Sequence, residues 1–284
     1  MKIQHECLPC LINQAVRTAQ MTGAPEPEAL YRRIFAAMSR MDFNASNPEI
    51  IGENFRLIKE QLGVEDPYQE TRIRYNRRFS EWIAAHQQRI PSMEEALMYA
   101  AAANIIDFNP IHQDVAAQID RQLSHVDESR FAVLDTGLLR QELSRAETLL
   151  YLGDNCGEIC FDKLAIRRIR QEYPNCQVFY GVRGAPVVND ATRADAHMTG
   201  MAQVARVISN GDDSLGTVLS RVSPEFLAVW QKADVVIAKG QANYESLCDA
   251  GKPVYYLMTV KCAVIARLTG CPKGSLVCMR LPKA

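Results

Sequence analysis

The stretch YLGDNCGEICFDK, residues 151–163, places an Asp, an Asn, a Glu and two cysteines around one glycine. An apolar run precedes the stretch and a helical pattern follows it, as expected where a strand of a parallel sheet meets a ligand. The residue types fit a nucleotide-binding turn, a redox pair of cysteines or a metal site. Asp154 and Asn155 offer hard oxygen atoms, which are the ligands that Mg²⁺ and Mn²⁺ prefer.

Polar side chains follow each of the later apolar runs as well. They are Arg183, Asn189 and Asp190 after the run at 176–182; Asn210, Asp212 and Asp213 after 205–209; Lys239, Gln241 and Asn243 after 234–238; and Thr259 and Lys261 after 253–258. Because the carboxyl ends of parallel strands meet at one edge of the sheet, we expect these groups to lie together. Asp212 and Asp213, within SNGDDS, fit a turn first.

This mixture favours a divalent cation surrounded by phosphate-binding groups. Asp154, Asn155 and Asp190 supply oxygen ligands, and Arg183 and Lys239 supply cations suited to a phosphate. Such a site hydrolyses phosphoryl groups, because the metal polarises the phosphoryl oxygen or activates water while the cations stabilise the transition state. Each residue alone also fits a structural role, the aspartates as helix caps and the cations as surface charges. Several such coincidences at one edge of the sheet are less likely than any single one, so the set as a whole favours a functional site.

The elements that must position these groups change character near residue 147. Before it, apolar residues recur at helical spacing in segments 7–20, 27–41, 47–63, 68–90 and 92–108. After it, short apolar runs alternate with helical patterns, which predicts crossover connections and a mostly parallel sheet. We therefore expect an α/β fold with a helical region at 1–145 and, at 146–284, a Rossmann-like three-layer core that binds metal and phosphate.

Several helix boundaries are also readable. Asn47-Pro48 predicts a helix start with Pro at the first position, and Gly63 predicts a helix end. Ser92 and Glu95 have the spacing of a capping box, so a helix should begin directly after Ser92.

Composition and charge limit the possible partners. The chain has 284 residues, a formal net charge of −1, 48% hydrophobic residues and 23% charged residues, which is ordinary for a globular protein. No overall field favours a nucleic acid or a membrane surface, and no run of about 18 apolar residues is present to span a bilayer. The start MKIQHECLPC lacks the apolar core of a signal peptide, so we expect a cytoplasmic protein. The oligomeric state stays open.

Other enzyme classes can be compared with the same stretch. The turn LGDNCGEI lacks the G-x-G-x-x-G of a dinucleotide site and is a poor match to the glycine-rich loop of an S-adenosylmethionine methyltransferase. No G-x-x-x-x-G-K-[ST] occurs, which excludes a P-loop NTPase. A haloacid-dehalogenase-type phosphatase needs a second Asp two residues after the first, where this chain has Cys156. Covalent aspartyl-phosphate chemistry is therefore not expected.

The nine cysteines are predicted to be mostly reduced, because their number is odd and no export signal is present. Cys156 and Cys160 are four residues apart with Cys156 in the turn, so packing is favoured over a redox pair. Cys7 and Cys10 form a C-x-x-C, but a second C-x-x-C at zinc-ribbon spacing is absent. Metal or redox use of this pair, with a distant cysteine as a further ligand, is the lesser interpretation.

Five blocks in the second half carry a family resemblance, and they occur in the order GDNCGEICFDKLAI, YGVRGAPVVNDATRADA, VISNGDDSLG, ADVVIAKGQANYESL and VKCAVIA. Upstream of them lie AANIIDF, residues 102–108, and the N-terminal CLPC. Over essentially its whole length the chain thereby resembles the DUF89 family of metal-dependent damage-control phosphatases. AANIIDF is similar to the family's Asn-x-x-Asp element, and CLPC is similar to a feature of its prokaryotic members.

The resemblance implies a helical region on an α/β core and a phosphatase that uses a divalent cation such as Mn²⁺, Mg²⁺, Co²⁺ or Ni²⁺. Its substrates would be small phosphorylated metabolites, either sugar phosphates or damaged phosphometabolites, attacked directly by water. The family's metal ligands correspond to Asp154, Asn155 and Asp190. Its catalytic roles are expected at Asp154, Asn155, Glu158, Arg183 and Lys239, and its substrate contacts at Asn104, Asp107, Arg183, Lys239 and Asn243. Two departures, Cys156 for the usual Ala and Ala103 for the common Gly, remove no ligand.

Three further hypotheses stay open at this point. A carboxyl methyltransferase has been proposed in the wider circle of this family and would bind S-adenosylmethionine. A non-catalytic metal- or nucleotide-binding module would bind a ligand without turnover. A third hypothesis places the function at Cys7 and Cys10, as a redox or metal-delivery motif.

Overall fold

The computed structural model describes residues 1–24, 26–104, 119–120, 123 and 126–282. Its centre is a seven-stranded sheet with the order β1-β7-β6-β5-β2-β3-β4. The parallel strands are β2 (Thr148–Leu152), β3 (Gln177–Val182), β4 (Arg206–Ser209), β5 (Val235–Lys239) and β6 (Val254–Thr259). β7 (Leu276–Leu281) returns antiparallel beside β6, and β1 (Phe131–Leu134) pairs with β7 at the edge. The predicted mostly parallel α/β sheet is confirmed.

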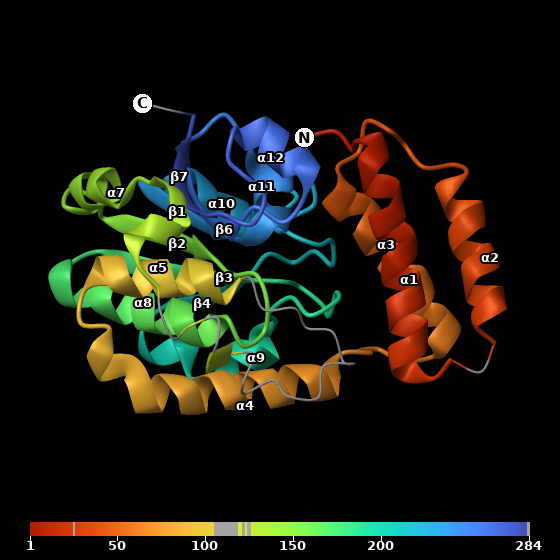
Figure 1. Ribbon diagram of the computed structural model, residues 1–284, viewed down its shortest axis with the longest axis horizontal. Coiled ribbons are helices and arrows are strands. Elements are labelled where there is room, and N and C mark those ends of the chain that lie inside the picture. Colours follow the sequence, from red (N-terminus) through yellow and green to blue (C-terminus); the bar gives the residue numbers. More distant parts are fainter. Residues whose placement is uncertain (25, 105–118, 121–122, 124–125, 283–284) are drawn as a thin grey trace.

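Helices cover both faces of the sheet and make a three-layer arrangement (Figure 1). One face carries α4 (Gln69–His86), α5 (Met93–Ala103), α7 (Thr136–Leu143), α8 (Ile159–Glu172) and α9 (Arg193–Met198). The other face carries α10 (Pro224–Lys232), α11 (Gly240–Leu247) and α12 (Ala263–Thr269).

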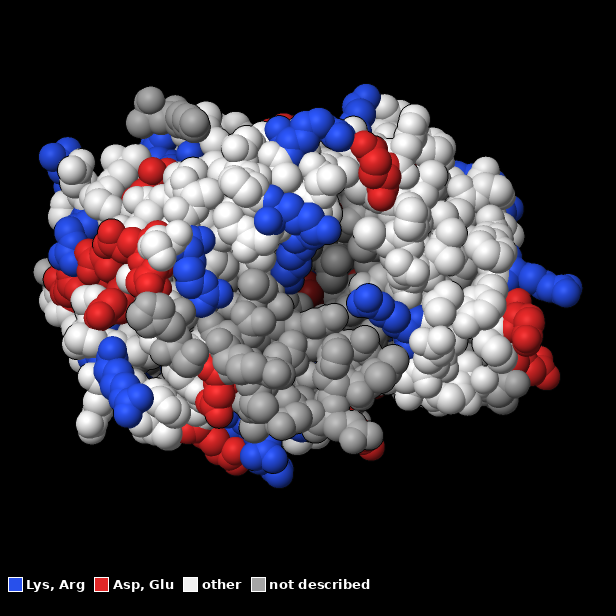
Figure 2. All heavy atoms as spheres, viewed as in Figure 1, with Lys and Arg blue, Asp and Glu red and all other residues white. Residues whose placement is uncertain are grey.

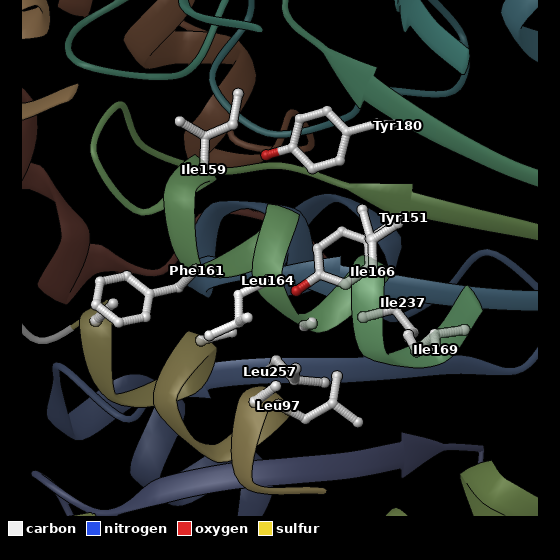
Figure 3. Packing of buried hydrophobic residues seen from close by; sticks show 14 of the residues in the cluster. Leu97, Tyr151, Ile159, Phe161, Leu164, Ile166, Ile169, Tyr180, Ile237 and Leu257 are labelled. Atoms are coloured by element: carbon white, nitrogen blue, oxygen red, sulfur yellow. The ribbon is translucent and has the colours of Figure 1, made fainter. Parts of the chain in front are cut away.

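The two cores follow from the alternation of side chains along each strand. Leu149 and Tyr151 of β2 face α8, whereas Leu150 and Leu152 face α10–α12. Figure 3 shows the first of these cores, in which Tyr151 and its neighbours pack against α8 and α5. Every residue of β2 is buried, as expected for a central strand of a parallel sheet.

The first three helices form a separate cluster beside the sheet, at the right in Figure 1. They are α1 (Leu8–Thr22), α2 (Pro27–Met38) and α3 (Asn47–Leu62). Their shared core also takes in Val187 and Val188 from the segment after β3, and Val264 from α12. Leu215, in the loop after β4, donates its N–H to the Pro48 carbonyl at 3.3 Å. This cluster therefore rests on the loops that follow the parallel strands.

The helix starts follow the local sequence signals. The capping box of Ser92 and Glu95 is present and begins α5, as predicted. α3 is capped by Ser46 with Glu49, so that Pro48 is the second helical residue, where the sequence predicted the first. Gly63 ends α3 with a left-handed φ of 63°, as predicted. Short 3₁₀ turns lie at His5–Cys7, Gln87–Arg89, Glu128–Arg130 and Met201–Gln203.

Two features before residue 146 go beyond the expected helical region. Residues 131–143 form β1 and α7, and β1 belongs to the sheet. α4 and α5 also pack on the sheet, in one core with α8. The division at residue 145 stays a prediction. Among the residues described above, no helix combines the length and apolar character needed to cross a bilayer.

Candidate active site

The segments after β2 and β3 carry the three predicted metal ligands and are joined by backbone hydrogen bonds. Ala191 donates its N–H to the Asp154 carbonyl at 2.6 Å, and Cys156 donates to the Asn189 carbonyl at 2.8 Å. Asn155 and Asp190 face each other in an isolated antiparallel bridge. Asp154, Asn155 and Asp190 are all buried. Residues far apart in the sequence thus form one acidic site at the carboxyl edge of the sheet, as predicted.

Two amide side chains hold the carboxylates of this site. Asn104, which caps the end of α5, donates from Nδ2 to Asp154 Oδ2 at 2.8 Å and to Glu158 Oε1 at 3.0 Å. Asn155 Nδ2 donates to the same two carboxylates, at 2.9 Å to Asp154 Oδ2 and 2.7 Å to Glu158 Oε1. Asn104 Oδ1 in turn accepts the N–H of Thr259 at 3.4 Å. The sequence-predicted Asn104 therefore belongs to the site, and Asp107 lies outside the described residues.

The donor atoms of the site fit a divalent cation. No described residue donates a hydrogen bond to Asp154 Oδ1, Asn155 Oδ1 or Asp190 Oδ1, while the other polar atom of each side chain is engaged. Among the described residues, each predicted ligand thus keeps one oxygen without a hydrogen-bond donor, and hard oxygen ligands suit Mg²⁺ and Mn²⁺. Within the described part of the chain, no three His, Cys, Asp or Glu side chains form a metal cluster. The amide oxygen of Asn155 would therefore be needed as a ligand.

Burial disfavours the charged forms of the two aspartates of the site. Burial, then Asp190 and Glu158, raise the pKa of Asp154 to about 8. Burial also raises the pKa of Asp190, although the Arg183 guanidinium opposes the shift. Two adjacent buried carboxyl groups with raised pKa values favour either protons or a bound cation.

Arg183 is buried, and each of its three guanidinium nitrogens donates a hydrogen bond within the protein. Its Nε donates to Asp190 Oδ2 at 2.6 Å, and Nη2 donates to the Gly153 carbonyl at 3.3 Å. Nη1 lies 3.4 Å from Thr217 Oγ1. Asn243 supports the same group, because its Oδ1 accepts from Thr217 at 2.8 Å and its Nδ2 donates to Gly153 at 3.1 Å. Arg183 and Asn243, two of the residues predicted to contact substrate, therefore lie at the site. Here they orient Asp190 and the Gly153 backbone.

Lys239, the last residue of β5, is also buried and paired with carboxylates. Its Nζ lies 3.0 Å from Glu158 Oε2 and 3.0 Å from Asp162 Oδ1. Lys239 thus contacts the site by its ion pair with Glu158. A direct contact of Lys239 or Arg183 with phosphate stays a prediction.

Gly240 gives Asp154 the space that it occupies. This residue begins α11 with a φ of +78°, and a Cβ built on it would lie 1.9 Å from Asp154 Oδ2. Only glycine adopts this backbone readily and leaves room for the carboxylate.

Lys261 is a further cation near the site, at a position that the sequence also predicted to lie at this edge of the sheet. It follows β6, is exposed, and its charge lowers the pKa of Asp154. The signal was its place after a parallel strand, the same position that marked Asp154 and Arg183. Figure 2 shows Lys and Arg residues beside a hollow near the middle of this face, with atoms of Asp or Glu residues visible inside.

The other candidates from the sequence, Asp212, Asp213 and the cysteines, have other contacts. Asp212 accepts from Arg221 at 2.9 Å and Asp213 pairs with Arg56, which agrees with a structured turn. All nine cysteines are free. Cys7 and Cys156 are buried and burial raises the pKa of both thiols, whereas Cys10 is exposed, and a metal or redox role of the Cys7–Cys10 pair stays a prediction.

The chain is similar in sequence and in structure to known proteins. A family model described as the damage-control phosphatase ARMT1-like domain matches residues 3–277. The chain is 33% identical to a damage-control phosphatase of Pyrococcus horikoshii, with 99% of this chain and 98% of that protein aligned. It is 28% identical to a damage-control phosphatase of Archaeoglobus fulgidus over 98% of both chains. The crystal structure of a DUF89 family protein from P. horikoshii superposes with a TM-score of 0.88, at 32% identity and 99% coverage of both chains.

Proposed function

The chain belongs to the damage-control phosphatase ARMT1-like family and is a phosphatase, and from this premise we propose that it hydrolyses phosphate monoesters of small metabolites at the Asp154–Asp190 site. One observation carries the proposal. Asp154, Asn155 and Asp190 each keep an oxygen to which no described residue donates, at the edge where the strands end. Sugar phosphates and damaged phosphometabolites are the substrate class that we expect.

A bound Mn²⁺, Mg²⁺, Co²⁺ or Ni²⁺ supplies Lewis acidity, which polarises a phosphoryl oxygen and lowers the pKa of water. Asp154, Asn155 and Asp190 would hold the ion. Glu158 accepts the Asn155 amide at 2.7 Å and so keeps Asn155 Oδ1 turned away from the carboxylates. Arg183 holds Asp190 Oδ2 in the same way and leaves Oδ1 available.

The reaction transfers the phosphoryl group directly to water. A bond forms between the water oxygen and phosphorus, the ester bond from phosphorus to oxygen breaks, and the alcohol leaves with a proton. A covalent route through an aspartyl phosphate needs a second acid two residues after the first. That position is Cys156, a buried residue whose backbone N–H donates to the Asn189 carbonyl. The absence of an acid at this position supports direct attack by water.

The positive charges divide into two groups. Arg183 and Lys239 are buried and act through Asp190 and Glu158, so they balance the charge of the acidic site. Lys261 is exposed and its charge lowers the pKa of Asp154, so we assign it to the phosphate of the substrate.

The test is phosphate release from an aryl phosphate with and without EDTA, followed by addition of each of the four metal ions. We expect turnover to stop in EDTA and to return with a divalent ion. Asp154→Ala should be inactive in added Mn²⁺, whereas the matched surface variant Asp42→Asn should keep wild-type turnover. Activity that is indifferent to EDTA, or full turnover by Asp154→Ala, would sink the metal mechanism.

A screen across sugar phosphates, nucleotides and cofactor phosphates then identifies the substrate class. A thermal-shift titration with S-adenosylmethionine distinguishes the methyltransferase hypothesis, because a phosphatase site gives no shift. Ligand binding without any turnover in the metal-supplemented screen would favour the non-catalytic module.

A further inference from the structure

Arg72, in the first turn of α4, is a buried cation that binds the backbone of the metal-site segment. Its Nη2 donates to the Val188 carbonyl at 2.8 Å, and its Nη1 donates to the Asp190 carbonyl. Nε donates to Asp66 Oδ2 at 2.9 Å, and Asp195 Oδ2 lies 3.5 Å from Nη1. Arg72 is 4% exposed, so its contacts are with the protein. One side chain thus fixes two carbonyls of the segment that carries Asp190.

That segment has an unfavourable backbone conformation. Val188 has a φ of +45°, which is an outlier for a β-branched residue. Residues held in such regions cost about 1–3 kcal/mol and persist only where their surroundings fix them. Val188 lies two residues before Asp190, and Arg72 binds the carbonyl of each. Loss of Arg72 removes this restraint, and we expect the segment to relax in part and to shift Asp190.

The same face of α4 also holds the other ligand segment. Asn76, one turn after Arg72, accepts the N–H of Gly157 at Oδ1 with a distance of 2.6 Å. Its Nδ2 donates to Asp195 Oδ1 at 2.7 Å. Gly157 closes the turn that carries Asn155, with a φ of +75°. Residues four apart on a helix lie on one face, so α4 contacts both ligand segments at once.

We propose that Arg72 is a positioning residue that sets the metal affinity of the site by fixing the backbone of Asp190. It contacts neither substrate nor the available ligand oxygens. The inference rests on the proposed function, since it takes Asp154, Asn155 and Asp190 as the ligands. Its physical basis is that a metal site tolerates ligand displacements of only about 0.5 Å.

The experiment measures Mn²⁺ binding directly, by calorimetry on the full chain without substrate. Arg72→Met removes both carbonyl contacts, and we expect Mn²⁺ to bind at least about tenfold more weakly, equivalent to about 1.4 kcal/mol. Arg72→Lys keeps a buried cation that can reach one carbonyl, so its affinity should fall between that of Arg72→Met and the wild type. At saturating Mn²⁺, the kcat of Arg72→Met should be closer to the wild-type value than its Mn²⁺ affinity is.

Two controls separate positioning from general stability. Trp82→Phe disturbs the packing of α4 against Phe161, far along the helix from Arg72, and should lower Tm while leaving Mn²⁺ affinity unchanged. Arg72 also lines a surface cavity of about 470 Å³, which gives a small cation a way in. Millimolar guanidinium should therefore restore Mn²⁺ binding to Arg72→Ala and leave Trp82→Phe unaffected.

The outcomes separate this inference from the proposed function. If Asp154→Asn abolishes Mn²⁺ binding and folded Arg72→Met binds Mn²⁺ within twofold of wild type, the positioning role is wrong and the metal site stands. A Trp82→Phe variant that weakens binding as much as Arg72→Lys would also overturn the positioning role. If the wild type binds no divalent ion at all, the proposed function and this inference fail together.

Discussion

The ammonium of Lys239 lies 3.0 Å from Glu158 Oε2 and 3.0 Å from Asp162 Oδ1, and all three side chains are fully buried. Two tyrosine hydroxyls complete the group, since Tyr151 and Tyr180 donate to the two oxygens of Asp162 at 2.9 and 2.8 Å. Figure 3 shows both rings beside α8. Burial lowers the pKa of Lys239, but Asp162 and Glu158 raise it by more, so the lysine stays charged. Lys239 thus joins the core of the sheet to the acidic site.

Lys239→Met should destabilise the protein strongly, because it leaves two buried carboxylates without their cation. Breaking a buried ion pair from one side costs about 3–5 kcal/mol. Urea unfolding of wild type and variant measures the loss. Adding Asp162→Asn to Lys239→Met removes one unpaired charge, so the double variant should regain part of that stability. Equal stability of Lys239→Met and wild type would contradict the ion-pair assignment.

Gly240→Ala should abolish activity by displacing Asp154, whose Oδ2 would lie 1.9 Å from the new methyl carbon. Gly251 is a matched control, since its φ is +71° and nothing lies within 4 Å of a Cβ there. Both variants carry the cost of alanine at positive φ, about 1 kcal/mol, so both should unfold slightly earlier. Only Gly240→Ala should lose Mn²⁺ binding and phosphate release. Similar activity losses in the two variants would mean that backbone strain alone is responsible.

Mn²⁺ binding should strengthen as the pH rises from about 6.5 to about 8.5. Burial, Asp190 and Glu158 raise the pKa of Asp154 to about 8, while Lys261 and Arg183 oppose the shift. Below that pKa a proton competes with the metal for the carboxylate, and above it the site is ionised.

The same shift contributes to the pH dependence of the stability of the metal-free protein. The folded pKa of Asp154 lies above the unfolded value, so the folded state binds the extra proton between about pH 4 and pH 8. Stability therefore falls as the pH rises through this window, and the stabilisation by Mn²⁺ should grow. Thermal melts with and without Mn²⁺ at both pH values measure this. A metal-induced shift in Tm that is larger at pH 6.5 than at pH 8.5 would contradict the prediction.

Much of the site was predictable because its position depends on topology. Once the alternation of runs after residue 147 indicated a parallel sheet, the residues after each strand had to meet, and Asp154, Asn155 and Asp190 do. The engagement of Arg183 and Lys239 was not predictable. Their partners depend on side-chain packing in the folded core, which strand ends alone do not specify.

The contribution of α4 was missed for a physical reason. In RIRYNRRF a charged helical residue reads as solvent-exposed, since single basic residues mostly are. The available signal was that Arg72 lies three residues before Tyr75 and Asn76 three residues before Phe79, on the same buried face of the helix. β1 was missed because its four residues are too short for a period to show.

Lys261→Met should weaken substrate binding without affecting the fold. Lys261 is exposed, and its charge lowers the pKa of Asp154. A hydrogen bond to a charged group contributes about 1.5–3 kcal/mol. We therefore expect kcat/KM for an aryl phosphate to fall about 10- to 100-fold, mainly through KM, with Tm unchanged. Losing this charge also raises the pKa of Asp154 further, so Mn²⁺ binding should need a higher pH.

The matched control for that variant is Lys273→Met, an exposed lysine in the loop before β7 that should keep wild-type kinetics. Two readouts make the assignment of Lys261 specific. Loss of phosphate contact raises KM, and loss of the positive charge beside Asp154 moves the pH profile of metal binding in the alkaline direction. A Lys261→Met enzyme with an unchanged KM would assign the phosphate to another cation. An altered KM with an unchanged pH profile would place Lys261 at the substrate but too far from Asp154 to act on it.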